Sequence, residues 1–277
     1  MNALSIAVDP SGNAYVAGSA TTPAGGPSGN TFLDKIASDG SVIVFSRVLP
    51  AGVLAIAADS MGNVTVGGYA SASAFPPTST FGQSALVARI SADGSTILWS
   101  VQLGSTVTIS GQTGYSQVQS LALDSSGNVY LTGVAPVPVP TVPGALQPTF
   151  TNPFFNNAFF AELSSDGTKL LAATNLSGHN GATLNGVVLD PSGNPWITGN
   201  TSSADFPGLT NPSSSSLDFA LERLFKPGDG LHQVSCPLKT AVSAHANRRA
   251  RNCAAPPGAT SPENRSVKRL WASSGCG

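Results

Sequence analysis

The feature that most constrains the fold is a short motif that the chain repeats four times. It reads DPSGNAYVAG from Asp9, ADSMGNVTVGG from Ala58, LDSSGNVYLTG from Leu123 and LDPSGNPWITG from Leu189. The aspartates that anchor the motif are separated by 50, 65 and 66 residues. Self-similarity at such a spacing indicates a chain built from similar supersecondary units packed in series.

Each copy of this motif predicts a β-hairpin. The Asp accepts backbone N–H bonds at the opening of a turn, and the Gly three residues later takes a positive φ without steric cost. The flanking residues alternate and are β-branched or aromatic, as at Tyr15 and Val16. We therefore expect a type I turn followed by a bulge.

A second motif alternates with the first. It reads KIASDGSVIVFS from Lys35, RISADGSTILWS from Arg89 and ELSSDGTKLLAA from Glu162, and its Asp-Gly pair is a strong hairpin signal. Two hairpins give four antiparallel strands per period, with first strands expected at 4–8, 54–58, 121–123 and 187–189. Four strands in a period above about 40 residues favour propeller blades over an immunoglobulin-like array or a helical solenoid. The predicted fold class is all-β, a β-propeller of four-stranded antiparallel blades.

The chain resembles the bacterial SBBP-type β-propeller repeat family over nearly all of residues 4–224. The resemblance rests on LDPSGNPWITGNTSSADFPG from Leu189, PGALQPTF from Pro143 and AFFAELSSDG from Ala158. It implies a multi-bladed propeller in a secreted or cell-surface protein, with no shared catalytic residues. The first repeat lacks the Ser-x-Asp-Phe-Pro element, and the second has Ala74 where the Asp would stand.

The number of blades is low for a closed propeller. The chain carries three complete repeats and about half of a fourth, whereas propellers have about 4 to 8 blades. We therefore expect an incomplete propeller with exposed apolar faces at its terminal blades. The missing blades would come from a longer native chain or from another chain.

The charge pattern divides the chain near residue 224. Residues 1–222 carry twelve acidic and four basic side chains, whereas residues 223–277 carry two acidic and nine basic ones and all three cysteines. The alternating apolar pattern also stops after Leu224. We predict a repeat region at 1–224 and a basic, Cys-containing tail at 225–277 that is disordered or frameshifted, with a short genuine module as the alternative.

The tail offers little recognisable chemistry. The basic stretches ANRRARN from Ala246 and SVKRLW from Ser266 supply positive charge without the pattern of a folded nucleic-acid module, so no nucleic acid is expected as a partner. The spacings of four possible zinc ligands match no common finger. These four are His232, Cys236, His245 and Cys253.

Two of the Asp turns contain possible calcium ligands. The side chains are Asp9, Ser11 and Asn13 in the first turn, and Asp190, Ser192 and Asn194 in the fourth. Calcium takes 6 to 8 oxygen ligands, so a short loop with one carboxylate falls short, and Met61 interrupts the set in the second turn. We expect these oxygens to satisfy the backbone of the turn, and we predict no metal and no cofactor.

No catalytic residue is predicted. His179 has no partner in the sequence that would orient it as a base, and Asp205 and Asp218 show no fixed pairing. Asp205 is expected to cap a blade connection. Trp99, Tyr130 and Trp196 lie in predicted strands and are expected to fill the core between blades, although one of them could line a sugar-binding face.

The sequence favours a non-catalytic platform outside the cell. Loops 68–84 and 133–157 would bind a protein, a glycan or a surface polymer; the alternative is a propeller enzyme such as a lyase or glycosidase. The enzyme would need acids or histidines converging on a central channel, and the repeats contain few. No signal peptide follows Met1 and no apolar run approaches about 18 residues, so we expect neither an export signal nor a membrane span in this sequence, and the extracellular or cell-surface location is what the family resemblance implies.

Overall fold

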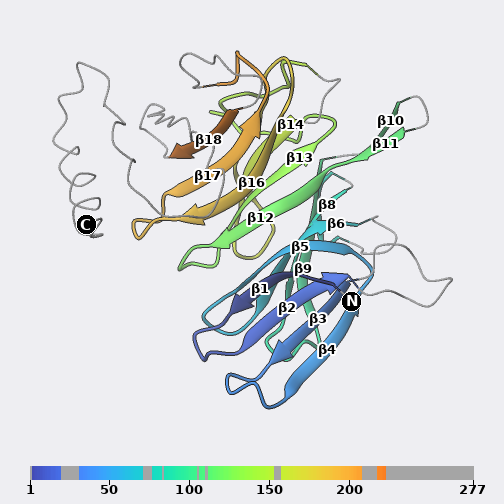
Figure 1. Ribbon diagram of the computed structural model, residues 1–277, viewed down its shortest axis with the longest axis vertical. Helices are drawn as coiled ribbons and strands as arrows, with labels where there is room; N and C mark the ends of the chain where they lie inside the picture. The colour runs from blue at the N-terminus through green and yellow to red at the C-terminus, as the bar shows by residue number, and fades with distance from the viewer. Residues whose placement is uncertain are drawn as a thin grey trace, which may run out of the picture. The chain divides into compact units, whose positions relative to one another are not determined.

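The computed structural model describes residues 2–19, 31–70, 77–82, 84–104, 106–109, 112–152, 157–207 and 217–222. All of them belong to one unit, Met1–Thr240. Within these residues every regular element is a β-strand, and no helix could span a membrane (Figure 1). The all-β prediction is confirmed, whereas the predicted tail from Phe225 and its four zinc candidates lie outside the described residues.

The first and third sheets are four-stranded antiparallel sheets in chain order, as predicted. The first contains β1 (Asn2–Val8), β2 (Ala14–Ser19), β3 (Thr31–Ile36) and β4 (Ile43–Leu49). The third contains β12 (Gln117–Leu123), β13 (Val129–Ala135), β14 (Asn157–Leu163) and β15 (Leu170–Leu176).

The second sheet has one strand more than the sequence predicts. Its antiparallel strands are β5 (Gly52–Ala58), β6 (Val64–Tyr69), β8 (Ala85–Ile90) and β9 (Ile97–Gly104). A fifth strand, β7 (Ser79–Gly82), pairs in parallel with β9. It lies inside a predicted loop and is too short to show alternation, but it covers the backbone groups of an edge strand.

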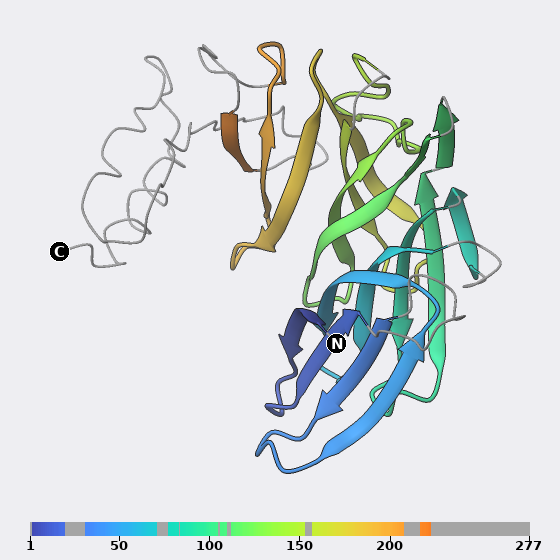
Figure 2. The same ribbon diagram turned by 45° about the vertical axis from the view of Figure 1, so that its right-hand side comes forward.

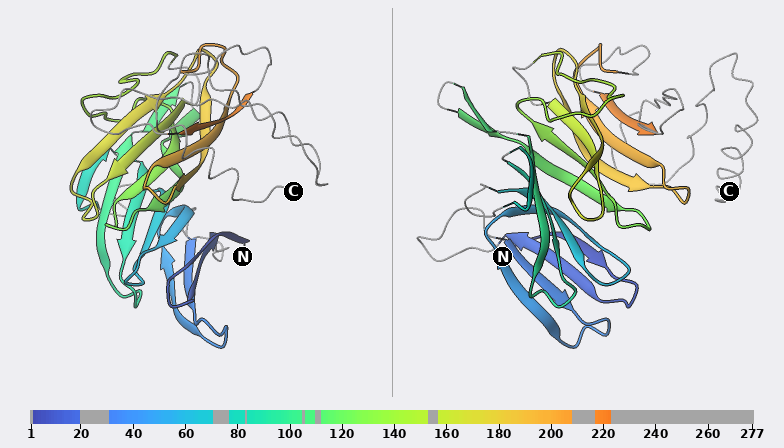
Figure 3. Two further views of the ribbon diagram at one scale, coloured as in Figure 1. Left: turned by 90° about the vertical axis from the view of Figure 1, so that its left-hand side faces the viewer. Right: turned by 180° about the vertical axis from the view of Figure 1, so that it is seen from behind.

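Two further differences concern the ends of sheets. A separate hairpin of β10 (Thr106–Ile109) and β11 (Gln112–Tyr115), which the sequence did not predict, follows the second sheet in the chain and projects away from the sheets (Figure 3). The fourth sheet has three strands among the described residues: β16 (Ala182–Leu189), β17 (Pro195–Thr201) and β18 (Leu217–Glu222). The expected first strands of all four sheets are confirmed by β1, β5, β12 and β16.

The Asp turns have the predicted hydrogen bonds. Asp9 Oδ1 accepts the backbone N–H groups of Ser11 and Asn13 at 3.0 and 2.9 Å, and Asp9 Oδ2 accepts the Asn13 side-chain amide at 2.8 Å. The same three bonds recur in the turns of Asp59, Asp124 and Asp190. Each carboxylate therefore closes its own turn, which explains why this motif repeats.

The sheets pack face to face in chain order (Figure 2). We call the face that packs on the following sheet the forward face, and the opposite one the rear face. Three clusters of buried side chains fill the three junctions, and representative pairs are Tyr15 with Val66, Trp99 with Leu131, and Phe160 with Ile197. These clusters hold the sheets together because each removes a continuous apolar layer from water.

The rear face of the first sheet is open. Leu4, Ile6 and Val8 of β1 are 54%, 67% and 59% exposed, and Val48 of β4 is 59% exposed. The corresponding face of the second sheet is buried, with Val66 fully inaccessible to solvent. The sheets therefore form an open series within the described residues, as expected for an incomplete propeller.

Candidate functional site

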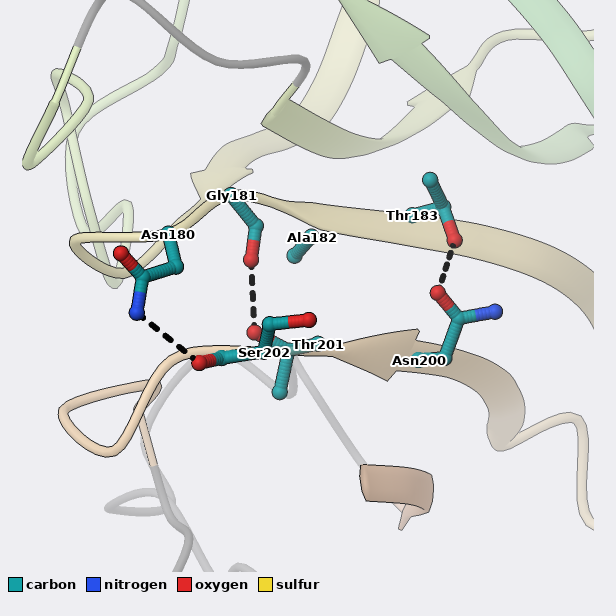
Figure 4. A pocket seen from close by; sticks show the side chains of 7 residues that line it. All are labelled: Asn180, Gly181, Ala182, Thr183, Asn200, Thr201 and Ser202. Carbon is teal, nitrogen blue, oxygen red and sulfur yellow. Dashed lines mark hydrogen bonds between the residues drawn. The ribbon is translucent and has the colours of Figure 1, made fainter. Parts of the chain in front are cut away.

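A hollow of about 240 Å³ opens at one end of β16 and β17 (Figure 4). Three hydrogen bonds arrange its wall: Thr183 Oγ1 donates to Asn200 Oδ1 at 2.8 Å, Asn180 Nδ2 to the Ser202 carbonyl at 3.0 Å, and Thr201 Oγ1 to the Gly181 carbonyl at 2.6 Å. Ala182 completes the lining. The wall is uncharged and consists of amides, hydroxyls and backbone groups, which can exchange hydrogen bonds with a polar neutral ligand.

The hollow lies at the end of the fourth sheet, and Thr183 and Asn200 line it from the forward face. Thr183 and Asn200 are partners in the β16–β17 register, so their side chains lie on the same face of the sheet. Leu184 and Ile197 point the other way and pack in the cluster with the third sheet. Side chains alternate along a strand, so Thr183 and Asn200 point away from the third sheet, whereas Ala182 of the same lining packs in the cluster with it.

Beside the hollow, the structure corrects the expectation that His179 has no orienting partner. His179 Nδ1 lies 3.1 Å from Asp205 Oδ2, and the His179 backbone N–H donates to Asp205 Oδ1 at 2.9 Å. The bonds from His179 hold the pKa of Asp205 below its ordinary value. A 26-residue separation hid this pair, because only the packing of the 178–181 and 202–205 segments brings the two residues together.

The hydroxyl of Ser203 ties the two segments together. The Asn180 N–H donates to Ser203 Oγ at 2.8 Å, and Ser203 Oγ donates to the Gly181 carbonyl at 3.1 Å. Asp205 is therefore a connection residue, as expected, and it also orients a histidine. The imidazole of His179 is 75% exposed and reaches water beside the hollow. The Asp218 side chain lies outside the described residues.

The three aromatic candidates have different positions. Trp99 is 7% exposed and is buried between the second and third sheets, with its Nε1–H donating to the Ser165 carbonyl at 3.0 Å. Tyr130 is half-buried against the cluster of the third and fourth sheets. Trp196 is half-buried on the forward face of the fourth sheet, where no other described sheet covers it. The prediction of a core position between blades is confirmed for Trp99 and holds in part for Tyr130, and it stays a prediction for Trp196, because no described residues form a following sheet.

Part of loop 133–157 serves the fold. Asn175 of β15 exchanges hydrogen bonds with Val139, as Val139 N–H to Asn175 Oδ1 at 2.9 Å and Asn175 Nδ2 to the Val139 carbonyl at 3.2 Å. Gln147 N–H donates to Thr174 Oγ1 at 2.9 Å. This segment covers the outer edge of the third sheet, as β7 covers that of the second. The backbone groups that it bonds in the edge strand β15 are therefore not open to pairing with another chain.

Basic side chains lock two of the junctions between sheets. Lys35 of the first sheet donates to the Ala92 carbonyl of the second at 3.1 Å and lies 3.5 Å from Asp9 Oδ2. Arg89 of the second sheet donates to the Ser165 and Gly127 carbonyls of the third at 3.0 and 2.8 Å. The sequence showed these residues at one position of the second motif, but only the packing reveals their acceptors.

The third sheet has Glu162 at this position. Its partner in the β13–β14 register is Tyr130, as Lys35 pairs with Tyr15. Burial, together with the negative charge of Asp124, raises the pKa of Glu162 above its ordinary value, although a hydrogen bond from Tyr130 opposes the shift. The third junction therefore lacks the built-in cation of the first two.

We expect Glu162→Gln to stabilise the protein at neutral and alkaline pH. The folded state binds a proton at Glu162 more tightly than the unfolded state, so its stabilising contribution is complete below about pH 4.3 and is lost as the pH rises through the raised pKa. Urea unfolding of both proteins across pH should give equal free energies near pH 4 and a growing advantage for the variant above it. A constant difference at all pH values would contradict this account.

Calcium should leave the melting temperature unchanged. Both oxygens of Asp9 and Asp190 already accept bonds within their turns, and the described residues contain no cluster of three or more acidic, Cys or His side chains suited to a metal. Thermal unfolding with calcium and then with a chelator is the measurement. A large rise that the chelator reverses would refute the prediction, because a ligand specific to the folded state stabilises it.

Stacked antiparallel sheets, built from hairpins that repeated Asp and Asp-Gly turns close, define a propeller-type repeat protein. A family model described as a beta-propeller repeat, SBBP, matches residues 2–23 and 98–135. These two stretches are therefore similar to SBBP beta-propeller repeats, in agreement with the sequence resemblance.

Solved structures give weaker likenesses. Hydrazine synthase of Kuenenia stuttgartiensis has 10% identity and a TM-score of 0.42, over 85% of this chain and 66% of that one. A protein from Lactobacillus plantarum has 14% identity and a TM-score of 0.47, over 88% and 58%. The chain thus spans less than two thirds of either structure, and neither likeness indicates a function. No curated protein sequence matches the chain.

Proposed function

We propose that the protein is a non-catalytic binding platform that acts outside the cell and takes a glycan or another neutral polar polymer at the hollow of the fourth sheet. The observation that carries the proposal is the chemistry of the wall. Asn180, Thr183 and Asn200 present amide and hydroxyl groups without a net charge. Such groups form the cooperative donor and acceptor pairs that sugar hydroxyls require.

The open ends of the series support a platform role. The rear face of the first sheet and the forward face of the fourth, with Val188 64% exposed, are covered by no other described sheet. We propose that further blades, from a longer native chain or from another chain, complete the propeller and place the hollow within a larger assembly. Loop 68–84 would add contacts with a protein partner.

A glycan screen tests the binding proposal. The purified protein should bind one or more neutral polysaccharides on an array, and Asn200→Ala and Thr183→Ala should each weaken that binding at least about tenfold, since one lost hydrogen bond is worth about 1.4 kcal/mol. Asn185→Ala is the matched control, because it removes an exposed amide of the same strand outside the hollow. Binding that survives both variants would place the site elsewhere.

A second function, a polysaccharide lyase or glycosidase, is favoured by the His179–Asp205 pair. Asp205 can hold Nδ1 protonated and leave the lone pair of Nε2 facing solvent, which is the arrangement of a general base. The same polysaccharides should therefore be assayed for cleavage. Product release that His179→Ala abolishes, with binding retained, would replace the platform by the enzyme.

A secreted protein should be found outside the cells that make it. The platform proposal includes this location, and a chain with only 10% charged residues, rich in hydroxyls and turns, supports it weakly. Fractionation of the native source with an antibody against the repeat region is the measurement. A signal confined to the cell interior would refute this part of the proposal and leave the binding assay unaffected.

A further inference from the structure

The two junctions that contain a basic residue use the same set of contacts. In each, a cation from the forward face bonds the carbonyl that precedes the Asp-Gly turn of the next sheet, at Ala92 for Lys35 and at Ser165 for Arg89. The carbonyl of the Asp-turn glycine is also bonded, at Gly62 by the Tyr15 hydroxyl and at Gly127 by Arg89. Two turns of one sheet thus form one acceptor for the preceding sheet.

An aromatic ring completes each of these junctions. Phe45 of β4 lies over Gly94, and Trp99 of β9 lies over Gly167, so close that a Cβ on either glycine would come within 2.7 Å of the ring. Both glycines are buried in consequence. The Asp-Gly turn is therefore a socket, and the outer strand of the preceding sheet supplies the ring that fills it.

The first sheet has the same acceptor on its rear face, and it is empty. Gly40 has a φ of 73°, like Gly94 at 74°, but no atom lies within 4 Å of its Cβ position. The Asp turn and the Asp-Gly turn of the first sheet lie against each other as they do in the second sheet. The Cβ position of Gly12 is 3.1 Å from Ser38 Cβ, and that of Gly62 is 3.4 Å from Ala92 Cβ. Gly12, Ser38 and Gly40 are all exposed.

The remaining surface of this rear face fits the same kind of neighbour. Leu4, Ile6 and Val8 are exposed in β1, and Val48 in β4. One carboxylate interrupts the apolar surface, Asp34, which accepts a hydrogen bond from Ser46 Oγ at 2.6 Å. A flat apolar sheet face with two carbonyl acceptors, an empty glycine socket and a carboxylate favours a partner that brings positive charge and an aromatic ring.

The third and fourth sheets of this chain do not match that requirement. The position of Lys35 is occupied by Glu162 in the third sheet, where Ala172 also replaces the aromatic of the outer strand. In the fourth sheet Glu222 pairs with Trp196 in the corresponding register. A carboxylate cannot donate to carbonyl acceptors, so a fourth sheet from a second copy is a poor occupant.

We propose that the rear face of the first sheet docks a β-sheet blade from another polypeptide segment, whose forward face carries a Lys or Arg at the Lys35 position and a Phe or Trp at the Phe45 position. The basic residue bonds the Ser38 and Gly12 carbonyls, and the ring covers Gly40. This partner chemistry deepens the proposal that further blades complete the propeller, and it is independent of glycan binding at the fourth sheet.

A fusion protein tests the pairing. A second copy of residues 2–51 is placed directly before Asn2 of the full chain, so that the native link of Pro50 and Ala51 joins the added sheet to the original one. We expect binding of the apolar dye ANS to fall about twofold and the melting temperature to rise by about 5 °C. The control fusion carries Lys35→Glu and Phe45→Ala in the added copy only, and it should lose most of both effects.

A substitution in the original sheet reports the socket directly. Gly40→Ala should lower the melting temperature of the fusion about as much as Gly94→Ala does, but should lower that of the unfused chain much less. Equal effects of Gly40→Ala in the two proteins, or equal stability of the two fusions, would overturn the proposal. So would a concentration-dependent dimer of the unfused chain that Ile6→Lys abolishes, since the occupant would then be a second copy. Glycan binding should be unchanged in every one of these proteins.

Discussion

Gly167→Ala should lower the free energy of unfolding by about 3 to 5 kcal/mol, whereas Gly40→Ala should lower it by only about 1 to 2 kcal/mol. Both glycines have a positive φ, 70° and 73°, so both variants carry the same backbone strain. Only the new Cβ at position 167 meets a side chain, at 2.7 Å from the Trp99 ring. The difference between the variants therefore measures the clash alone.

The ring of Trp99 has little room to yield. It is 7% exposed, its Nε1–H is bonded to the Ser165 carbonyl, and Arg89 lies 5.3 Å from the ring centroid. Urea unfolding followed by tryptophan fluorescence gives both free energies. Equal losses for the two variants would mean that the second and third sheets separate easily enough to relieve the contact, and the described junction would be wrong.

Arg89→Met should cost about 3 kcal/mol, because it removes the charged donor that bonds the half-buried carbonyls of Ser165 and Gly127, of which only Ser165 keeps another donor, the Trp99 Nε1–H. The aliphatic replacement keeps much of the packing volume, so the loss reports the hydrogen bonds and the contact with the Trp99 ring. Unfolding in urea at pH 7 is the measurement.

Arg89→Lys provides the control for this prediction. Lys35 already performs the same task at the first junction with a single bond to the Ala92 carbonyl, so a lysine at position 89 should recover part of the loss. A lysine variant as unstable as the methionine variant would show that charge at this position contributes nothing. The carbonyl contacts would then be a consequence of packing by Trp99 and its neighbours.

The strands and turns could be predicted from the sequence because their causes are local. An Asp that bonds its own turn, a Gly at positive φ and alternating side chains lie within a few residues of one another, as at Asp9 and Gly12. The added strand β7 could not be predicted, because its partner β9 lies about 20 residues further along the chain and its four residues carry no pattern.

The features of the candidate site depend on longer distances. His179 meets Asp205 across 26 residues, and Arg89 meets Ser165 across 76. No spacing rule links such pairs, since the length of each connecting loop decides the register between one sheet and the next. The second motif begins with a basic residue at Lys35 and Arg89 but with an acidic one at Glu162. This difference in the sequence indicates that the third junction is not built like the first two.

The first two junctions contain a basic residue, Lys35 or Arg89, whereas the third contains Glu162, so the stability of the junctions depends on pH in different ways. Burial alone would raise the pKa of Asp9, but the bonds from Asn13 and the charge of Lys35 outweigh it, so the pKa lies below its ordinary value. The first junction therefore weakens as acid protonates this carboxylate. Glu162 makes the third junction weaken in the opposite sense, as base ionises it. The first junction therefore loses stability only in acid, below the ordinary pKa of an aspartate, whereas the third loses it as the pH rises through the raised pKa of Glu162, so the two ends of the series respond to pH in opposite directions.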